Sequence, residues 1–339
     1  MSFMGRWLKF FAGLLVTGLC LWLVLRQVDW AEAWSTVQAA DAGWLFFGLV
    51  LLTAGYACRV LRWWLMLRSM SAGLVFSSCI GPFLSSMAIN NVLPFRAGDV
   101  LRVVGFRRHL EIDPIPVTST LVLERLLDLS ALLGFFFVGL LYVDEGLFPR
   151  TVVVTTGWMT AFCFVLVVVT VLVPHRLQEI ADALALTAEG RAWPLPGRIA
   201  MGLREFFSSL SAMRAPRLIA QLLTLSFTIW FLEGGVFMAV AHALDIRSVG
   251  AGPWFALATG TLGTLLPSTP GYVGTFDYFT MLGLMAYHVR QGVSAVFALI
   301  VHLLLWLPVT IAGLGWLMVH KLKASQASVE MTPSVTSTT

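Results

Sequence analysis

Six long apolar runs limit this 339-residue chain to very few folds. A helix that crosses a hydrocarbon core of about 30 Å needs roughly 20 consecutive apolar residues. Each run meets that requirement, and because 58% of all residues are hydrophobic and only 12% are charged, a soluble globule is excluded. The sequence therefore predicts an all-α polytopic membrane protein. The runs are Trp7–Leu25, Gly43–Met66, Ile115–Tyr142, Val152–Val173, Leu218–Leu244 and Ser294–Met318.

Two further apolar stretches, Leu74–Leu93 and Pro253–Leu266, are interrupted by Gly, Pro, Ser and Thr. If both dip into the membrane and return to the side they entered, the chain has six full crossings and its termini share a side. Most of the 22 Lys and Arg residues, including those of loop 174–216, then fall on that same side. By the positive-inside rule, both termini are expected to be cytoplasmic. A full crossing by Leu74–Leu93 would put the Arg-rich loop outside instead.

The two interrupted stretches end in related motifs, LPFRAG at 93–98 and LPSTPG at 266–271. In the predicted topology they lie between spans of opposite direction, so we expect two inverted repeats, each with three spans and a re-entrant helical hairpin. Unpaired backbone N–H and C=O groups are costly in lipid. The two hairpin tips are therefore expected to meet near the bilayer centre, buried in protein or lining a wet cavity.

This topology predicts four segments along the chain. Residues 1–173 form the first repeat with a hairpin at 74–110, and residues 174–216 form a cytoplasmic amphipathic connection. Residues 217–323 complete the second repeat with a hairpin at 253–290, and residues 324–339 form a disordered tail with little to bury. The four cysteines lie in apolar runs without C-x-x-C spacing, so we expect no metal site, disulfide framework or cofactor.

Charged residues inside the apolar segments are candidate functional groups, because a charge in a membrane is costly and tends to mark a pathway. Glu124 and Asp128 lie one helical turn apart near the middle of the third run, and Arg125 is placed to reach Asp128. Two interpretations stay open: handling of substrate or protons, or a structural ion network that fastens this span to the first hairpin. Glu233 lies midway along the fifth run, and Asp277 opens the helix after the second hairpin.

The hairpin turns supply a second group of candidates. A new helix is expected after each turn, near Ala97 and near Thr275, and its free N–H groups would favour an anion in the cavity. Arg96 lies beside the first of these helix starts. An ordinary connection between short helices is the alternative for both turns. His302, alone in an apolar stretch, is interpreted as a packing residue.

Three ordered motifs together resemble the flippase-like family, also called the lysylphosphatidylglycerol synthase transmembrane-region family. They are N-x-x-L-P-x-R-x-G-D-x-x-R at 90–102, E-R-x-x-D at 124–128 and L-P-x-x-P-G-x-x-G at 266–274. The resemblance extends over residues 5–322 and is to the stand-alone members without a synthase domain, so lipid synthesis is not implied. It implies movement of a polar or anionic lipid, such as a phospholipid, a hopanoid or a lipid-linked sugar, across the bacterial inner membrane.

These observations favour a lipid flippase or transporter that binds a phosphate headgroup. One alternative is a membrane-embedded enzyme that modifies a lipid with Glu124 and Asp128, and another is a non-catalytic subunit of a lipid-synthesis complex. No nucleic-acid partner is expected, whereas a homo-oligomer and a lipid-biosynthesis enzyme stay open as protein partners. The candidate substrate-binding residues are Asn90, Arg96, Asp99, Arg102, Glu124, Arg125, Asp128, Glu233, Gly271, Tyr272, Gly274 and Asp277.

Overall fold

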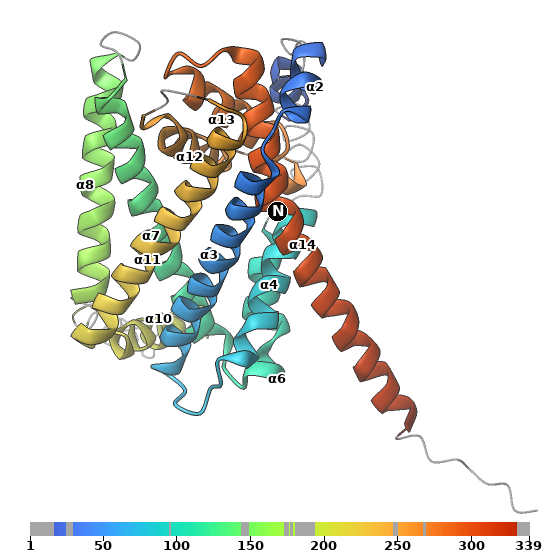
Figure 1. Ribbon diagram of the computed structural model, residues 1–339. Coiled ribbons are helices and arrows are strands. Elements are labelled where there is room, and N and C mark those ends of the chain that lie inside the picture. The colour runs from blue at the N-terminus through green and yellow to red at the C-terminus, as the bar shows by residue number, and fades with distance from the viewer. Residues whose placement is uncertain are drawn as a thin grey trace, which may run out of the picture.

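The computed structural model of the chain describes residues 17–24, 30–94, 96–143, 149–172, 176, 179, 194–246, 250–266 and 269–330. Within these residues the regular structure is helical and no strand is present (Figure 1). The helices are α2 (Trp30–Gln38), α3 (Ala42–Arg68), α4 (Ser77–Val92), α5 (Ala97–Val100), α6 (Arg107–Leu110), α7 (Pro114–Leu141), α8 (Arg150–Leu172), α10 (Pro194–Ala212), α11 (Pro216–Ala243), α12 (Gly252–Gly263), α13 (Thr275–Met285) and α14 (Gln291–Glu330). A π-helical turn, Leu101–Gly105, joins α5 to α6, and a 3₁₀ turn, Pro270–Tyr272, precedes α13.

Among the described residues, α3, α8, α11 and α14 are long and apolar enough to cross a membrane. They coincide with four of the six predicted spans. α7 is 28 residues long, but Glu124, Arg125 and Asp128 interrupt its apolar sequence. Of the first predicted span, Trp7–Leu25, only residues 17–24 are described, and they are helical. The prediction of an all-helical, multi-pass membrane protein is confirmed at this level.

The long helices lie side by side, and the short helices gather at the two ends of the bundle (Figure 1). α4 and α6 lie in the half of the bundle that also holds α10, whereas α12 and α13 lie in the opposite half. α3 packs antiparallel to α11, and the backbone N–H of Asp41 donates to the carbonyl oxygen of Ala243 at 2.9 Å. α4 packs against α14, and α12 packs against both α7 and α13. Two short helical hairpins are thus held between long helices.

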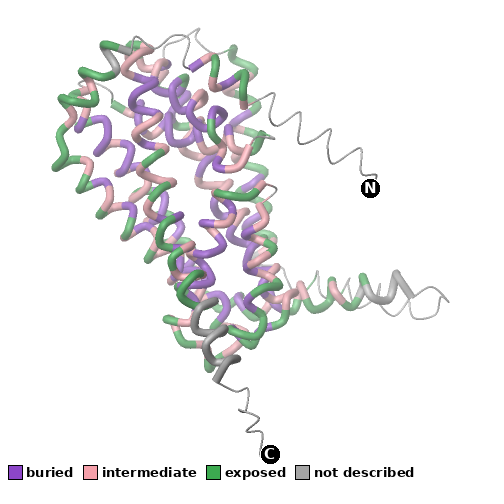
Figure 2. Tube along the Cα trace, turned by 90° about the vertical axis from the view of Figure 1, so that its right-hand side faces the viewer, coloured by how far each residue is buried: buried purple, intermediate pink, exposed green. Residues whose placement is uncertain are grey.

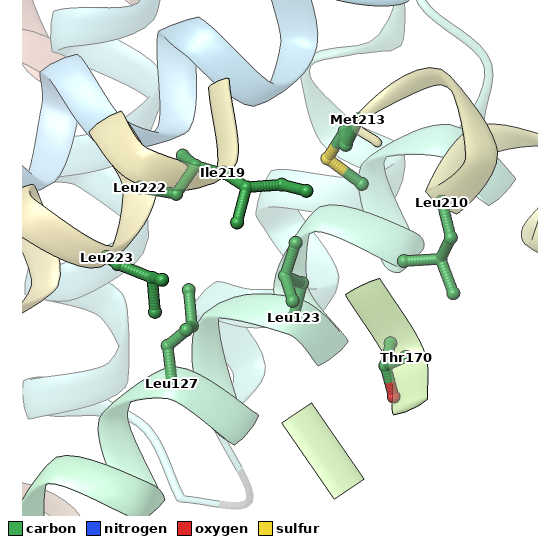
Figure 3. Close-up of a pocket in the computed structure, with 8 residues that line it drawn as sticks. All are labelled: Leu123, Leu127, Thr170, Leu210, Met213, Ile219, Leu222 and Leu223. Carbon is green, nitrogen blue, oxygen red and sulfur yellow. The ribbon is translucent and has the colours of Figure 1, made fainter. Parts of the chain in front are cut away.

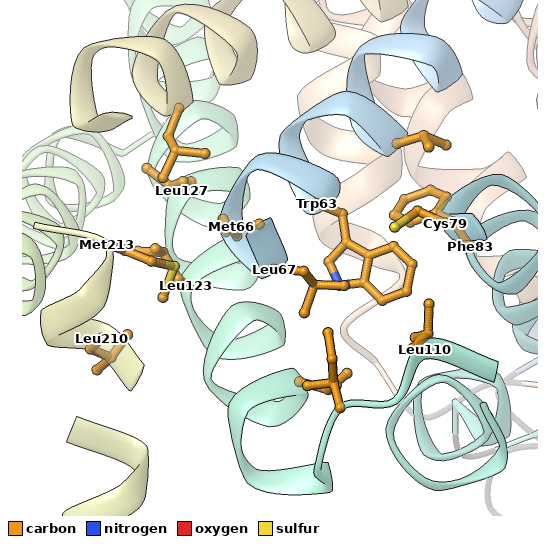
Figure 4. Packing of buried hydrophobic residues seen from close by; sticks show 14 of the residues in the cluster. Trp63, Met66, Leu67, Cys79, Phe83, Leu110, Leu123, Leu127, Leu210 and Met213 are labelled. Carbon is orange, nitrogen blue, oxygen red and sulfur yellow. The ribbon is translucent and has the colours of Figure 1, made fainter. Parts of the chain in front are cut away.

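Two apolar clusters fill the ends of the bundle. The first surrounds Trp63, which is fully buried among side chains of α3, α4, α6 and α7 (Figure 4). The second joins α7, α11, α12, α13 and α14. Along α7, Leu127 belongs to the first cluster and Leu132 to the second, so Asp128 lies between them. The acidic side chain of Asp128 on α7 therefore lies between the two apolar clusters, in the middle of the bundle.

The outer face of the bundle is apolar. Figure 2 shows buried residues in the interior and exposed ones on the outer helices, and the exposed residues include Trp158 and Phe162 of α8 and Phe227 of α11. Apolar surface of this extent on an isolated chain calls for apolar surroundings, which a lipid bilayer provides. The bundle therefore presents a lipid-facing surface.

α10 contains the amphipathic part of the predicted connection 174–216, and most of the rest of that segment lies outside the described residues. It packs on α7. The apolar space enclosed where α7, α8, α10 and α11 meet is only about 10 Å³, room for about one water molecule (Figure 3). α10 therefore packs closely on the end of the bundle.

The predicted tail, 324–339, overlaps the end of α14. α14 continues to Glu330. Once a helix has been nucleated, each further residue adds one hydrogen bond at little cost, and the Ala, Ser, Gln and Lys residues of this stretch do not stop it. Residues 331–339 lie outside the described part of the chain, as does Pro267 of the second motif.

Candidate substrate-binding site

A cavity of about 350 Å³ lies where the two hairpins end. Its wall is formed by α3, α4, α7, α11, α12 and α14 and by the turns of both hairpins, and polar and apolar side chains share it. A volume of this size suits a small molecule or a lipid headgroup. The predicted site residues on this wall are Asn90, Arg96, Arg125, Asp128, Glu233, Gly271 and Tyr272.

The first turn is held by hydrogen bonds between the two ends of the motif at 90–99. The side-chain N–H₂ of Asn90 donates to Asp99 Oδ1 at 2.9 Å, and the backbone N–H of Asp99 donates to Asn90 Oδ1 at 3.2 Å. A Cβ added at Gly98 would lie 1.8 Å from the carbonyl oxygen of Ser86, so only glycine lets α5 approach α4 this closely. Arg96, at φ 52°, turns the chain in the left-handed region. The polar residues of the motif therefore shape the turn as well as line the cavity.

The second turn has three residues at positive φ: Gly271 (73°), Tyr272 (57°) and Gly274 (86°). The backbone N–H of Gly274 donates to Oδ2 of Asp277 at 2.8 Å, so Asp277 caps the start of α13. His302 of α14 reaches across to the same turn, with Nδ1 2.7 Å from Asp277 Oδ1 and Nε2 2.9 Å from the carbonyl oxygen of Gly271. The turn is therefore tied to α14 through one imidazole ring.

The two turns meet at α14. The side-chain N–H₂ of Asn91 donates to Thr310 Oγ1 at 2.9 Å, and the indole N–H of Trp306 donates to the carbonyl oxygen of Asn91 at 3.4 Å. A Cβ added at Gly271 would lie 2.9 Å from the Trp306 indole nitrogen and 3.1 Å from the Asn91 carbonyl oxygen. The end of α4 and the 3₁₀ turn are thus in direct contact.

The charged residues of α7 pair with arginines and an aspartate from elsewhere in the chain. The ion pairs are Arg102–Glu124 (2.7 Å), Arg125–Asp99 (3.0 Å) and Arg62–Asp128 (2.9 Å). The expected pairing of Arg125 with Asp128 is therefore wrong. Arg125 leaves the helix about 100° from Glu124 and so faces another neighbour, whereas Glu124 and Asp128 share a face but lie one turn apart and reach different arginines.

Across the α3–α11 interface, Arg59 forms an ion pair with Glu233 and also lies over the Trp230 ring, 5.2 Å from its centroid. The indole N–H of Trp230 donates to Asp128 Oδ1 at 3.2 Å. Arg96 differs from these cations, because it has no ion-paired or hydrogen-bonded partner among the residues that the structure describes. It is the side chain on the cavity wall with positive charge left to bind a ligand.

The remaining predicted residues do not line the cavity. Arg102 and Glu124 are almost fully buried together, and the Arg102 guanidinium lies 5.1 Å from the centroid of Trp63 and 4.9 Å from that of Phe83. This pair fastens the first hairpin to α7. Asp99 lies behind the first turn, bound to Arg125.

Two predicted residues of the second hairpin also lie off the cavity wall. Asp277 is 1% exposed and lies behind His302. Gly274 faces the N-terminal helical segment, since a Cβ added there would lie 2.7 Å from the carbonyl oxygen of Thr17. Thr17 itself is hydrogen-bonded to Thr269 in the same turn. Both residues therefore support the turn from its outer side.

Sequence reasoning missed several residues of the site. Arg59 and Arg62 are not among the predicted site residues, but both belong to the ion pairs inside the bundle. Their position within an apolar run was the signal that could have identified them. His302, interpreted as a packing residue, lines the cavity with Tyr56 and Trp306. In the described part of the chain, no group of three or more His, Cys, Asp or Glu is placed to hold a metal ion.

Comparison with known proteins identifies one family and two relatives. A profile of the family described as "Lysylphosphatidylglycerol synthase TM region" matches residues 10–313. The chain is 29% identical over 297 residues to glycosyltransferase AglD of Haloferax volcanii, which covers 78% of this chain and 47% of AglD. It is 24% identical over 196 residues to the UPF0104 membrane protein MJ1078 of Methanocaldococcus jannaschii, covering 57% of this chain and 76% of that protein. The chain thus spans about half the length of AglD, and no solved structure matches it.

Proposed function

The chain belongs to the lysylphosphatidylglycerol synthase transmembrane-region family, and on that premise we propose that it moves an anionic lipid across the membrane through the cavity between its two hairpin turns. The observation that carries the proposal is Arg96, a cation without an ion-paired partner among the described residues, on the wall of a cavity of about 350 Å³. A phosphate headgroup would form charge-assisted hydrogen bonds with this guanidinium. The acyl chains would stay in the surrounding lipid.

The proposed architecture has six crossings and two inverted repeats, whose re-entrant hairpins lie within 1–173 and 217–323. The packing supports it: α4 lies on α14 and α12 lies on α7, so each hairpin contacts the long helix that follows the other hairpin. α3 and α11 would be equivalent, and they pack on each other. Arg59 and Glu233, which bind each other, lie the same number of residues from the helix starts at Ala42 and Pro216. Transporters built from such repeats expose a central site to each side in turn.

The proposed orientation places the end of the bundle with α6 and α10 in the cytoplasm, together with both termini, in the inner membrane of a bacterium. Arginines gather at this end, as the positive-inside rule requires of cytoplasmic segments. They are Arg68, Arg107, Arg108, Arg204, Arg214 and Arg217, whereas Arg150 and Arg290 are at the opposite end.

The second candidate is an enzyme that modifies a lipid, because the relative AglD is named a glycosyltransferase. In this chain Glu124 and Asp128, the carboxylates first considered for acid–base work, each bind an arginine. Glu124 also lies off the cavity wall, and Asp128 is held by Arg62 and Trp230, so we place transport first. A covalent change in a lipid-linked sugar or an anionic lipid, detected by mass spectrometry after incubation with the purified chain, would favour the enzyme.

The transport proposal is tested with purified protein in liposomes that contain a fluorescent anionic phospholipid, whose movement between leaflets is followed by chemical quenching from outside. Arg96→Gly removes the charge and keeps the left-handed backbone, which glycine adopts readily. We expect transport to slow roughly tenfold or more, since a hydrogen bond to a charged group is worth about 1.5–3 kcal/mol. Arg96→Lys should retain part of the rate, and Arg107→Gly, which removes an exposed arginine paired with Asp113, should not change it.

Two outcomes would reject the proposal. One is lipid movement no faster than in empty vesicles for the wild-type protein across several anionic lipids. The other is an Arg96→Gly variant that is as fast as the wild type, which would show that the cavity cation has no part in transport.

A further inference from the structure

His302 is held between two hydrogen-bond acceptors of the second hairpin. Its Nδ1 lies 2.7 Å from Asp277 Oδ1, and its Nε2 lies 2.9 Å from the carbonyl oxygen of Gly271. The second carboxylate oxygen of Asp277 already accepts the backbone N–H of Gly274. The His302 side chain is 14% exposed and lines the cavity, whereas Asp277 is 1% exposed behind it. A proton on this pair can therefore exchange with the cavity through the imidazole.

These two contacts fix the number of protons on the pair. A neutral imidazole has one N–H and one lone pair, so beside an ionised Asp277 it can donate to only one of the two oxygens. Both contacts are satisfied only when the pair carries one more proton, as imidazolium with carboxylate or as neutral imidazole with carboxylic acid. Because the two groups interact strongly, these arrangements form one protonation state of the pair.

When that proton leaves for the cavity, one ring nitrogen of His302 has a lone pair in place of its N–H. This lone pair would face an acceptor oxygen of Asp277 or Gly271, so one of the two contacts must open. The charged carboxylate of Asp277 is the stronger acceptor and keeps the remaining N–H. The contact that opens is therefore the one with Gly271. This residue belongs to the turn with Tyr272 at φ 57°, a conformation that persists only when surrounding contacts hold it. Since the turn abuts Asn91, its release loosens the contact between the two hairpins.

The first hairpin has an equivalent pair that cannot respond in this way. Asp99, at the start of α5, binds Arg125 of α7, just as Asp277, at the start of α13, binds His302 of α14. Arg125 lies the same number of residues from Pro114, the start of α7, as His302 lies from Gln291, the start of α14. Arginine stays protonated in proteins, whereas histidine titrates near neutral pH. The pair at the second hairpin can therefore titrate near neutral pH, whereas the pair at the first cannot.

Other charges on the cavity wall act on this site. Most occur as pairs of opposite sign, whereas Arg96 is the cation without an ion-paired partner among the described residues. A phosphate bound at Arg96 would bring negative charge into the cavity that His302 also lines. The other charged or titratable side chains on the described wall are Tyr56, Arg59, Arg125, Asp128, Glu233 and Tyr272.

We propose that His302 and Asp277 form a proton-binding site that holds the second hairpin turn closed when occupied, so that the proton is the ion coupled to lipid movement. The coupling half of this statement rests on the proposed function. The proton-dependent turn does not, and it can be measured without any lipid transport.

The test is hydrogen–deuterium exchange of the full-length protein in nanodiscs between about pH 5 and pH 8, the range in which histidine titrates. Labelling times are scaled to the intrinsic exchange rate at each pH. In the wild type, exchange of the amides at 269–277 is expected to rise roughly tenfold or more toward high pH, as expected for the loss of one charge-assisted hydrogen bond. Amides at 97–103, in the first hairpin, should show no such rise.

Variants separate the site from other titrating groups. His302→Arg, which copies the first hairpin's pair, should keep slow exchange at 269–277 at every pH. In His302→Gln and in Asp277→Asn, the scaled exchange of the amides at 269–277 should not change with pH. His242→Gln, which removes a histidine stacked on Trp44 outside the cavity, should behave like the wild type. If the His302 variants do not fold, the wild-type titration and Asp277→Asn still decide the question.

The proposal is overturned if exchange at 269–277 in the wild type is independent of pH, or if His302→Gln keeps the wild-type response. A pH-dependent turn in a protein that moves no lipid would instead reject the proposed function and leave the proton site standing. Lipid transport that proceeds equally with and without a pH gradient, in a protein whose turn responds to pH, would reject the coupling alone.

Discussion

Arg62 is 1% exposed, and its guanidinium donates to both Asp128 and Ser226 at 2.9 Å. A buried ion pair of this kind adds little stability over well-packed apolar residues, but removing one partner leaves an uncompensated charge. If Arg62 were removed, the indole N–H of Trp230, at 3.2 Å, would be the remaining hydrogen-bond donor to Asp128 among the described residues. The pair therefore makes the packing of α3 against α7 and α11 depend on complementary charges.

Arg62→Met is accordingly expected to lower the free energy of unfolding by about 3–5 kcal/mol, because it leaves Asp128 buried and unpaired. Denaturant titration in detergent micelles, followed by circular dichroism, measures this loss. The double variant Arg62→Met/Asp128→Leu should recover most of it. Arg107→Met, which breaks the exposed Arg107–Asp113 pair, should cost at most about 1 kcal/mol. Equal losses for Arg62→Met and Arg107→Met would contradict the structural role of the buried pair.

At this scale the sequence identified residue types better than it identified partners. Glu124, Arg125 and Asp128 stood out because they are charged within an apolar run, and each does form an ion pair. The partners could not be predicted, since pairing of Arg62 with Asp128 depends on how α3 and α7 pack. His302 was missed for the same reason: Asp277 and Gly271 reach it from another hairpin.

At the scale of helices, α4 docks on α14 through a glycine. A Cβ added at Gly313 would lie 2.2 Å from the carbonyl oxygen of Leu84 and 2.6 Å from the Cβ of Ala88. Ser85 also donates its hydroxyl to the carbonyl oxygen of Gly313 at 3.2 Å. Small residues at helix contacts in membranes allow the backbones to approach closely. This contact therefore sets the position of the first hairpin.

Gly313→Ala is expected to lower the free energy of unfolding by about 1–3 kcal/mol, because the added methyl group forces α4 away from α14. Gly315 lies on the same helix, and a Cβ there meets no atom within 4 Å. Gly315→Ala should therefore be neutral or stabilise the helix by up to about 1 kcal/mol. Both variants are compared by denaturant titration in micelles. A loss for Gly315→Ala as large as that for Gly313→Ala would contradict close packing at Gly313.

Hydropathy predicted the long helices well, because length and apolar composition suffice to identify α3, α8, α11 and α14. It did not predict which helices touch, since the lipid-facing and protein-facing sides of such helices are both apolar. At the end of the chain, α14 extends through the start of the predicted tail, 324–339. The LP motifs did identify both turns, since proline and glycine act there through backbone geometry.

At the scale of the molecule, two hairpins from opposite ends of the bundle meet at one cavity, and α14 contacts both of them. Asn91 and Gly271 contact each other and the indole nitrogen of Trp306, so the two turns meet at the cavity wall. If the cavity is a transport site, at least one turn must move during each cycle.

The most direct test joins the two turns. Asn91→Cys and Tyr272→Cys are introduced into a chain whose four native cysteines are replaced by alanine, and the pair is linked with a short, cleavable thiol reagent. In liposomes, the unlinked variant provides the reference rate of anionic lipid movement. We predict that linking abolishes this movement and that cleavage restores it. Lipid movement that is as fast with the turns linked as with the turns free would contradict transport through the cavity between them.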